Sequence, residues 1–277
     1  MNREISLEEL KKIQIEILDE VHSYCEQKGL VYFLSSGTLI GAIRHKGYIP
    51  WDDDIDIYMP RPDYEKFVST FNGSADKYRV ISLSTDKSCS FAYAKVERRG
   101  TRIIEQVDHP MEIGVNIDVF PVDGVPDEEK CRNHYFSKIQ RLRDAMILKD
   151  VSVNWRGRSL LKNFALMGGK LLLSGKSLRS LAMRLDKTID KSLTDSQYVC
   201  NMVLGNGIKS IFSRKAIDGT VDVEFEGKKY KTMIGWDEYL TKTYGDYLTP
   251  PIYNTHIIHL QRITRFCWSN AEALCCA

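Results

Sequence analysis

Four carboxylates fall within five residues in the run WDDDIDI at 51–57. At an intermediate dielectric, two like charges about 4 Å apart repel each other by roughly 4 kcal/mol, so this run needs a cation. Asp54 and Asp56 alternate with Ile55 and Ile57, which is the period of a β-strand. The two carboxylates therefore share one face while the isoleucines enter the core. Two carboxylates on a rigid strand make a hard oxygen site suited to Mg²⁺ or Mn²⁺.

A solvated surface turn and a calcium-binding loop are the two other interpretations of the acidic run. A surface turn has no need of the interleaved isoleucines. A calcium loop shares the alternate acids Asp52, Asp54 and Asp56, but it requires glycine next and glutamate at its twelfth position. This chain has Ile57 and Asp63 there. The run is therefore interpreted as a cation-binding strand.

A segment just upstream predicts a site for an anion. Residues 30–34 form a short apolar run that predicts a buried strand. Ser36, Gly37 and Thr38 form a turn of small residues before the helix-compatible residues 39–44. A helix that starts this way presents N–H groups and hydroxyls to phosphate, although such a turn alone is weak support for a site. Together with the acidic strand, it predicts the layout of a nucleotidyltransferase.

A further acid lies on an apolar run later in the chain. Residues 114–120 alternate as a strand does, with Asp118 on the same face as Asn116 and Phe120. Burying a carboxylate without a partner costs several kcal/mol, so Asp118 needs one. A hydrogen bond from the next loop and a bound metal both meet that need, and spacing alone does not choose between them.

Composition excludes some classes of function. The chain has 39 basic and 37 acidic residues, so there is no overall basic field of the kind that predicts nucleic-acid binding. The N-terminus lacks the apolar core of a signal peptide, and no stretch approaches the roughly 18 apolar residues of a spanning helix. The seven cysteines show no zinc spacing. We therefore expect a cytoplasmic protein without a nucleic-acid partner.

One segment carries a local basic field. No acid falls between residues 151 and 184, where seven bases are interleaved with apolar residues. The bases are Arg156, Arg158, Lys162, Lys170, Lys176, Arg179 and Arg184. A basic amphipathic segment can lie on an anionic membrane, which predicts peripheral contact at its inner face through residues 156–184. A helical subdomain with solvated bases has the same pattern, so both interpretations stay open.

Periodicity predicts an α/β (α+β) fold, with a mixed β-sheet core, flanking helices and a helical insertion. A capping box at Ser6 opens a first helix that Gly29 closes, and Asp63 is expected to cap a short helix after the acidic strand. We expect a catalytic core over 1–125, a helical insertion over 126–195 and a C-terminal mixed α/β segment over 196–277 that completes the domain.

Three segments, in order along the chain, resemble the LicD family of bacterial phosphocholine transferases, which is related to the fukutin group. They are GTLIGAIRHKGYIPWDDDIDI at 37–57, IDVFPVD at 117–123 and YGDYLTPP at 244–251. The first is long and specific. Residues 252–277 lack the aromatic and basic ending usual in the family, which leaves this tail without an assigned role. The resemblance implies a nucleotidyltransferase-like fold.

The resemblance also implies a reaction. Phosphocholine would pass from CDP-choline to a sugar hydroxyl of a glycan or lipid-linked glycan precursor of teichoic acid, lipopolysaccharide or capsule. It favours Asp118 as the third ligand, with Asp54 and Asp56, of one or two Mg²⁺ (or Mn²⁺) ions. Residue spacing alone reaches only metal-dependent phosphoryl transfer. The alternatives are another nucleotidyl- or phosphosugar transferase on the same fold and a catalytically silent partner protein.

The other candidate residues are assigned to the substrates. Either Asp118 or Asp52 is expected to accept the proton of the attacking hydroxyl. Phosphate oxygens are expected to lie against Ser36, Gly37 and Thr38, with charge-assisted contacts from Arg44, Lys95 and Arg98. Trp51 is expected to form a wall for the choline head group, since aromatic faces attract quaternary ammonium ions.

Overall fold

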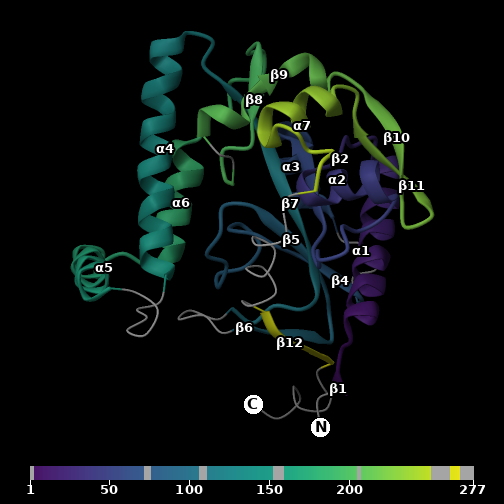
Figure 1. Ribbon diagram of the computed structural model, residues 1–277, viewed down its shortest axis with the longest axis horizontal. Helices are drawn as coiled ribbons and strands as arrows, with labels where there is room; N and C mark the ends of the chain where they lie inside the picture. The colour runs from purple at the N-terminus through teal and green to yellow at the C-terminus, as the bar shows by residue number, and fades with distance from the viewer. Residues whose placement is uncertain are drawn as a thin grey trace.

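The computed structural model describes residues 3–71, 76–105, 111–151, 159–204, 207–250 and 263–268. It confirms the expected α/β class, with a curled mixed sheet and flanking helices (Figure 1). The helices are α1 (Leu7–Lys28), α2 (Ser36–His45), α3 (Arg61–Thr70), α4 (Glu129–Asp150), α5 (Leu160–Leu172), α6 (Leu178–Thr188) and α7 (Trp236–Tyr244). Short 3₁₀ turns are η1 (Gly207–Ser210) and η2 (Arg214–Ile217).

The main sheet has the strand order β2-β3-β7-β5-β4, and β8 and β9 continue it from β7. These strands are β2 (Phe33–Leu34), β3 (Asp56–Pro60), β4 (Tyr78–Ile81), β5 (Ala94–Arg98), β7 (Asn116–Val125), β8 (Tyr198–Cys200) and β9 (Phe212–Ser213). Only the central pair β3 and β7 is parallel among the described pairings. The two strands that carry the predicted carboxylates therefore lie next to each other.

Two smaller sheets complete the described strands. One is the hairpin of β10 (Thr220–Phe225) and β11 (Lys228–Met233). The other joins β1 (Arg3–Glu4), β12 (Ile263–Trp268) and β6 (Thr101–Glu105). The tail that lacked an assigned role thus contributes β12, while the rest of 252–277 lies outside the described residues.

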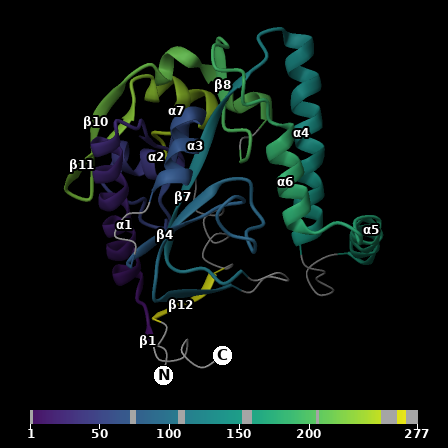
Figure 2. The same ribbon diagram turned by 180° about the vertical axis from the view of Figure 1, so that it is seen from behind.

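Helices stand along two opposite flanks of the sheet. α1 lies on one flank, and α4 and α6 run side by side along the other (Figures 1 and 2). The capping prediction for α1 is confirmed, because the Ser6 hydroxyl accepts from the Glu9 N–H at 3.2 Å and Gly29 ends the helix at φ 62°. An apolar stripe of α1 that includes Ile17 and Val21 is fully buried in the main core.

The helix after the acidic strand begins earlier than the sequence predicts. α3 starts at Arg61, and Asp63 lies within its first turn instead of capping it. Pro60 and Pro62 explain the shift, because a proline presets the backbone angle of a helix start and loses no helical hydrogen bond there. Asp63 still lies near the positive end of the helix dipole.

The C-terminal hairpin braces the loop that leads into the acidic run. Its turn at Glu226 and Gly227 has positive φ angles of 51° and 74°, as a two-residue hairpin turn with a matching twist requires. The Glu226 N–H donates to the Lys46 carbonyl at 2.8 Å, and the Tyr48 N–H donates to the Glu226 carboxylate at 3.0 Å. A segment 178 residues away in sequence thus fixes this loop.

The predicted helical insertion contains α4, α5 and α6. Arg156 and Arg158 of its basic segment lie outside the described residues. None of the described helices is both long enough and apolar enough to cross a membrane. The division of the chain at residues 125 and 195 stays a prediction.

Candidate active site

Strand register brings the predicted carboxylates together. Asp56 on β3 lies opposite Asp118 on β7, and Lys95 on β5 lies opposite Asp118 from the other side. The Lys95 ammonium forms an ion pair with the Asp118 carboxylate and donates to the Asn116 side-chain oxygen at 3.2 Å. The partner of Asp118 in this structure is therefore a lysine, which spacing along the sequence did not indicate.

The acidic run enters the sheet through Ile55. Its carbonyl accepts from the Asp118 N–H at 2.8 Å, just before β3 begins at Asp56. Ile55 and Ile57 are fully buried, as their alternation predicts. This burial fixes which face of the strand the carboxylates take.

A cavity of about 410 Å³ opens beside these strands. Its polar lining includes Gln14, Asp53, Asp54, Lys95, Asn116, Asp118 and Asp150. Its apolar lining includes Phe91, Tyr93, Ile103, Met111, Ile113, Met146, Ile147 and Leu178. Three of the residues predicted from sequence, Asp54, Asp118 and Lys95, thus face one common space.

Burial makes the acidic run costly to ionise. Burial, together with the charges of Asp52, Asp118 and Asp53, raises the pKa of Asp54 to about 7. Burial, together with the charges of Asp54, Asp118 and Asp52, raises the pKa of Asp56 well above its ordinary value. Burial also raises the pKa of Asp52, which is hydrogen-bonded to Asp54. The group is held where it requires protons or a cation.

Lys95 neutralises only part of the negative charge of these carboxylates. Burial lowers its pKa, but the charge and the hydrogen bond of the facing Asp118 carboxylate outweigh this effect and raise the pKa of Lys95 overall. It is therefore a fixed cation at neutral pH. One positive charge does not balance the carboxylates Asp54, Asp56 and Asp118 together.

The chemistry of the donor set fits a hard divalent cation, because it consists of buried carboxylate oxygens that repel one another. Within the part of the chain that the structure describes, no three His, Cys, Asp or Glu side chains are arranged as a ready-made metal site. The assignment of Asp54, Asp56 and Asp118 as metal ligands therefore stays a prediction.

The small-residue turn lies behind the acidic run. The Thr38 hydroxyl accepts from the Asp56 N–H at 2.9 Å, and the Ser36 N–H donates to the Tyr239 hydroxyl at 3.2 Å. A Cβ on Gly37 would lie 2.5 Å from an Asp52 carboxylate oxygen. In the described structure Gly37 and Thr38 lie against the acidic run, and none of the three residues lines the cavity. Their contact with phosphate stays a prediction.

Three other predicted residues lie away from the cavity lining. Arg44 donates to the Tyr247 carbonyl at 3.0 Å, which joins the first resembling segment to the third. The Arg98 guanidinium lies 5.6 Å from the centre of the Tyr78 ring. Trp51 packs, half-buried, against the main core. Their predicted contacts with substrate stay predictions.

Gln14 is a cavity residue that the sequence analysis missed. Its side-chain amide donates to the Asp53 carbonyl at 2.9 Å and accepts from the Tyr48 hydroxyl at 3.0 Å. It therefore anchors the backbone of the acidic run from α1. The sequence signal that could have identified Gln14 is its place, as a polar residue, on the apolar stripe of an amphipathic helix.

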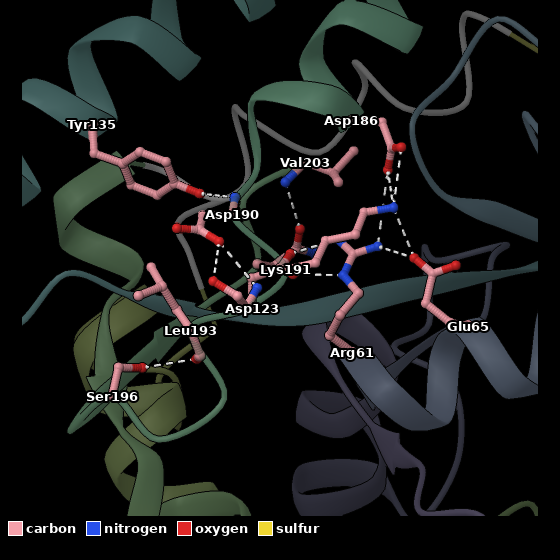
Figure 3. A network of polar contacts seen from close by, with 12 residues as sticks. Arg61, Glu65, Asp123, Tyr135, Asp186, Asp190, Lys191, Leu193, Ser196 and Val203 are labelled. Carbon is pink, nitrogen blue, oxygen red and sulfur yellow. Dashed lines mark hydrogen bonds and ion pairs between the residues drawn. The ribbon is translucent and has the colours of Figure 1, made fainter.

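Asp123, in the second resembling segment, has a structural role at the opposite end of β7. The Arg61 guanidinium makes a two-point contact with its carboxylate at 2.6 and 2.7 Å (Figure 3). Arg61 also contacts Glu65 at 3.2 Å, and Lys191 contacts Glu65 at 2.8 Å. Asp123, the last residue of IDVFPVD, therefore belongs to this ion-pair network and does not line the cavity.

Comparison with known proteins now places the chain in a family. The family model described as "LicD/FKTN/FKRP, nucleotidyltransferase domain" matches residues 29–146. The lipopolysaccharide cholinephosphotransferase LicD of Haemophilus influenzae (strain ATCC 51907 / DSM 11121 / KW20 / Rd) is 31% identical over 268 residues, which cover 94% of this chain and 98% of that protein. The chain belongs to the LicD family.

Shorter matches to other proteins are also found. Uncharacterized protein RP689 of Rickettsia prowazekii (strain Madrid E) is 35% identical over 68 residues, 21% of this chain and 26% of that protein. Uncharacterized protein RT0683 of Rickettsia typhi (strain ATCC VR-144 / Wilmington) is 40% identical over 48 residues, 17% of this chain and 16% of that protein. The LicD-family range 29–146 contains the acidic run, Lys95 and Asp118.

Proposed function

We propose that this LicD-family phosphotransferase moves phosphocholine from CDP-choline to a sugar hydroxyl of a cell-surface glycan precursor. The observation that carries the proposal is the meeting of the acidic run, Asp118 and Lys95 at one cavity. A chain that is similar over 94% of its length to a lipopolysaccharide cholinephosphotransferase supports the choice of phosphocholine. The acceptor, a cell-surface glycan precursor, is also part of the proposal.

Asp54, Asp56 and Asp118 would hold Mg²⁺ or Mn²⁺ in this proposal. Such an ion, when bound, neutralises charge on the donor pyrophosphate and on the leaving CMP. Lys95 adds a fixed positive charge beside Asp118 that favours the same anionic groups. Burial of these side chains keeps the local dielectric low, so each charge acts more strongly than it would in water.

The acceptor hydroxyl must lose a proton as it attacks phosphorus. Asp52 and Asp118 are the two acids predicted to accept it, and Asp118 is the one that lines the cavity. A proton acceptor has to lie within hydrogen-bonding reach of the hydroxyl in the bound complex. This favours Asp118 as the base and leaves Asp52 to position Asp54, to which it is hydrogen-bonded.

The cavity also offers an aromatic wall for the choline head group. The ring centres of Phe91 and Tyr93 lie 4.7 Å apart. The Lys95 ammonium is 5.6 Å from the centre of the Phe91 ring and 5.4 Å from that of the Tyr93 ring. Ring faces that already accommodate a cation are suited to trimethylammonium. In this proposal Phe91, which lines the cavity, is a candidate choline contact in addition to Trp51.

A direct test is to incubate purified protein with CDP-choline, Mg²⁺ and glycan precursors and to measure CMP by chromatography. We expect CMP to appear only with a suitable acceptor and to disappear in EDTA. Asp118→Asn is the inactive control, and UDP-sugars in place of CDP-choline test the phosphosugar alternative. CMP release that is unchanged in Asp118→Asn, or transfer from UDP-sugars alone, would contradict the proposal.

A further inference from the structure

The outer face of α5 is apolar and open to solvent. Leu161, Phe164, Leu171 and Leu172 are 80%, 61%, 74% and 86% exposed. At 100° per residue these four side chains fall within an arc of about 100° on the helix. Isolated exposed leucines are ordinary, but a contiguous apolar stripe indicates an interaction surface.

The opposite side of α5 attaches the helix to the protein. Asn163 is fully buried and Leu166 is 9% exposed, so the inward side of the helix is the one that carries these two residues. Gly169 lies against α4, where an added Cβ would come within 2.7 Å of the Leu148 side chain. The apolar stripe therefore points away from the body of the molecule. α5 itself lies beside the last turn of α4, on the side away from the sheet (Figures 1 and 2).

Charge along the segment that carries α5 has one sign. The sequence has no Asp or Glu from residue 151 to residue 185. Lys162 and Lys170 lie on α5 and Lys176 follows it. A protein partner would ordinarily meet a mixed surface, whereas an apolar stripe on a helix whose only charged residues are bases matches an anionic lipid surface.

The helix has the dimensions of one that lies on a membrane. Its 13 residues make it about 20 Å long, which is shorter than the hydrocarbon layer of roughly 30 Å. Leucine and phenylalanine on one face of a helix whose only charged residues are lysines are typical of a helix that lies in the interface plane.

Both ends of the segment that carries α5 form part of the cavity wall. Met146, Ile147 and Asp150 line the cavity from the last turn of α4, and Leu178 lines it from the first turn of α6. A surface that holds α5 therefore also lies close to the cavity.

We propose that the outer face of α5 is a membrane-binding surface that inserts among anionic lipids. It thereby brings the cavity to an acceptor that is itself anchored in the membrane. This second inference, about the acceptor, rests on the proposed function. The occupant of the face is the lipid monolayer, and a second copy of the chain is an outcome that the test can detect.

The test uses the full-length protein and vesicles of phosphatidylcholine with or without phosphatidylglycerol. Leu171→Ser/Leu172→Ser removes two residues of the stripe. Ile208→Ser/Ile234→Ser is the matched control, because these isoleucines are 53% and 57% exposed on other elements. Co-sedimentation is measured at about 0.1 M and 1 M salt, between which the Debye length falls from about 10 Å to 3 Å.

We expect binding only to vesicles with phosphatidylglycerol, weakened by salt and reduced roughly tenfold by Leu171→Ser/Leu172→Ser. The control should bind as the unmodified protein does. Sedimentation velocity follows the oligomeric state in parallel. Absence of vesicle binding, equal loss in the control, or a dimer that only the α5 variant disrupts would overturn the proposal.

The inference that the acceptor is anchored in the membrane has its own readout. CMP release is compared for one glycan acceptor in two forms, water-soluble and attached to lipid in the same vesicles. We expect Leu171→Ser/Leu172→Ser to lower release with the lipid-attached form and to leave the soluble form unchanged. An equal effect on both forms would overturn it. Failure of the proposed reaction would instead abolish CMP release with both forms in the unmodified protein, while vesicle binding persisted.

Discussion

At the scale of single side chains, the cavity concentrates negative charge that the folded chain does not neutralise by itself. Lys95 pairs with Asp118, but burial and mutual repulsion still raise the pKa of Asp54 and of Asp56. Asp52 and Asp54 share a hydrogen bond within the same run. Retaining such a cluster lowers stability unless a ligand uses it.

Asp54→Asn and Asp56→Asn are each expected to abolish transfer while leaving the fold intact. The amide keeps the shape of the side chain and removes like-charge repulsion, so the melting temperature without metal should stay the same or rise. Activity is measured by CMP release, and Mg²⁺ binding by calorimetry. Asp218→Asn, outside the cavity, serves as the control. Unchanged Mg²⁺ binding in both variants would show that the metal lies elsewhere.

Glu65 provides a prediction of pH dependence. Burial raises its pKa, but hydrogen bonds and charges from Lys191 and Arg61 outweigh this and leave the pKa below its ordinary value. The native state therefore binds this proton less tightly than the unfolded state, so the stabilisation is present above about pH 4.5 and is lost as pH falls further.

Glu65→Gln should accordingly lower the free energy of unfolding by about 0–1 kcal/mol at pH 7, since the carboxylate is half exposed. The difference from the unmodified protein should shrink towards zero near pH 3. Urea unfolding at both pH values measures it. A difference that grows as the pH falls would contradict the assigned direction.

The sequence could identify the carboxylates because their signal is local. The alternation of Asp54 and Asp56 with isoleucines is visible within four residues. The pairing of Lys95 with Asp118 depends on the register of two strands, and Gln14 reaches the site only because α1 packs there. Such contacts between distant segments leave no periodic pattern.

At the scale of elements, α2 and the loop after it position the acidic run. The helix packs closely on that loop, so a Cβ at Gly41 would lie 3.1 Å from the Ile49 amide nitrogen and would collide with the Gly47 carbonyl. The hairpin β10–β11 holds the same loop through Glu226. Gly41, in the first of the three segments that resemble the LicD family, therefore allows close packing between the helix and the loop.

Gly41→Ala tests this packing. Alanine favours a helix by about 1 kcal/mol over glycine, but the backbone contact should reverse the sign and destabilise the protein by about 1–3 kcal/mol. Gly168→Ala is the matched control, because Gly168 is also helical and has no atom within 4 Å of an added Cβ. Thermal unfolding should show a loss for the first and no loss for the second. Equal effects would show that Gly41 is not a close-packing position.

Local signals also predicted several whole elements. The capping box at Ser6 and the glycine at Gly29 predicted both ends of α1, and the alternation at 114–120 predicted the first half of β7. The predicted start of α3 was wrong by three residues, because the two prolines outweighed Asp63 as the start signal. The pairing of β8 with the end of β7 could not be predicted, since it joins Asp123 to Cys200 across the helical segment.

At the scale of the whole molecule, the network around Arg61 joins the sheet to the helical segment. Arg61 and Asp123 are almost fully buried, and Lys191 links Glu65 to Asp186 of α6 (Figure 3). The pair lies just beyond the parallel pairing of β3 and β7, whose other end holds Asp56 opposite Asp118. It therefore helps to fix the register on which the site depends.

Asp123→Ala should destabilise the protein by about 3–5 kcal/mol, because it leaves the Arg61 charge buried without its main partner. Lys191→Ala, which removes a more exposed charge, should cost about 1 kcal/mol or less. Urea unfolding compares the two. The double variant Arg61→Met/Asp123→Leu should recover part of the loss. A loss no greater than that of Lys191→Ala would show that the pair does not stabilise the register.

Transfer of the phosphocholine group itself is the central claim, and one labelling experiment tests it most directly. CDP-choline carrying deuterium in the choline methyl groups is incubated with enzyme, Mg²⁺ and glycan acceptor, and the products are analysed by mass spectrometry and phosphorus NMR. We predict one labelled phosphocholine per modified sugar in phosphodiester linkage, with an equal amount of CMP. Label that stays in CDP-choline, or a glycan that gains CMP without the label, would contradict the account.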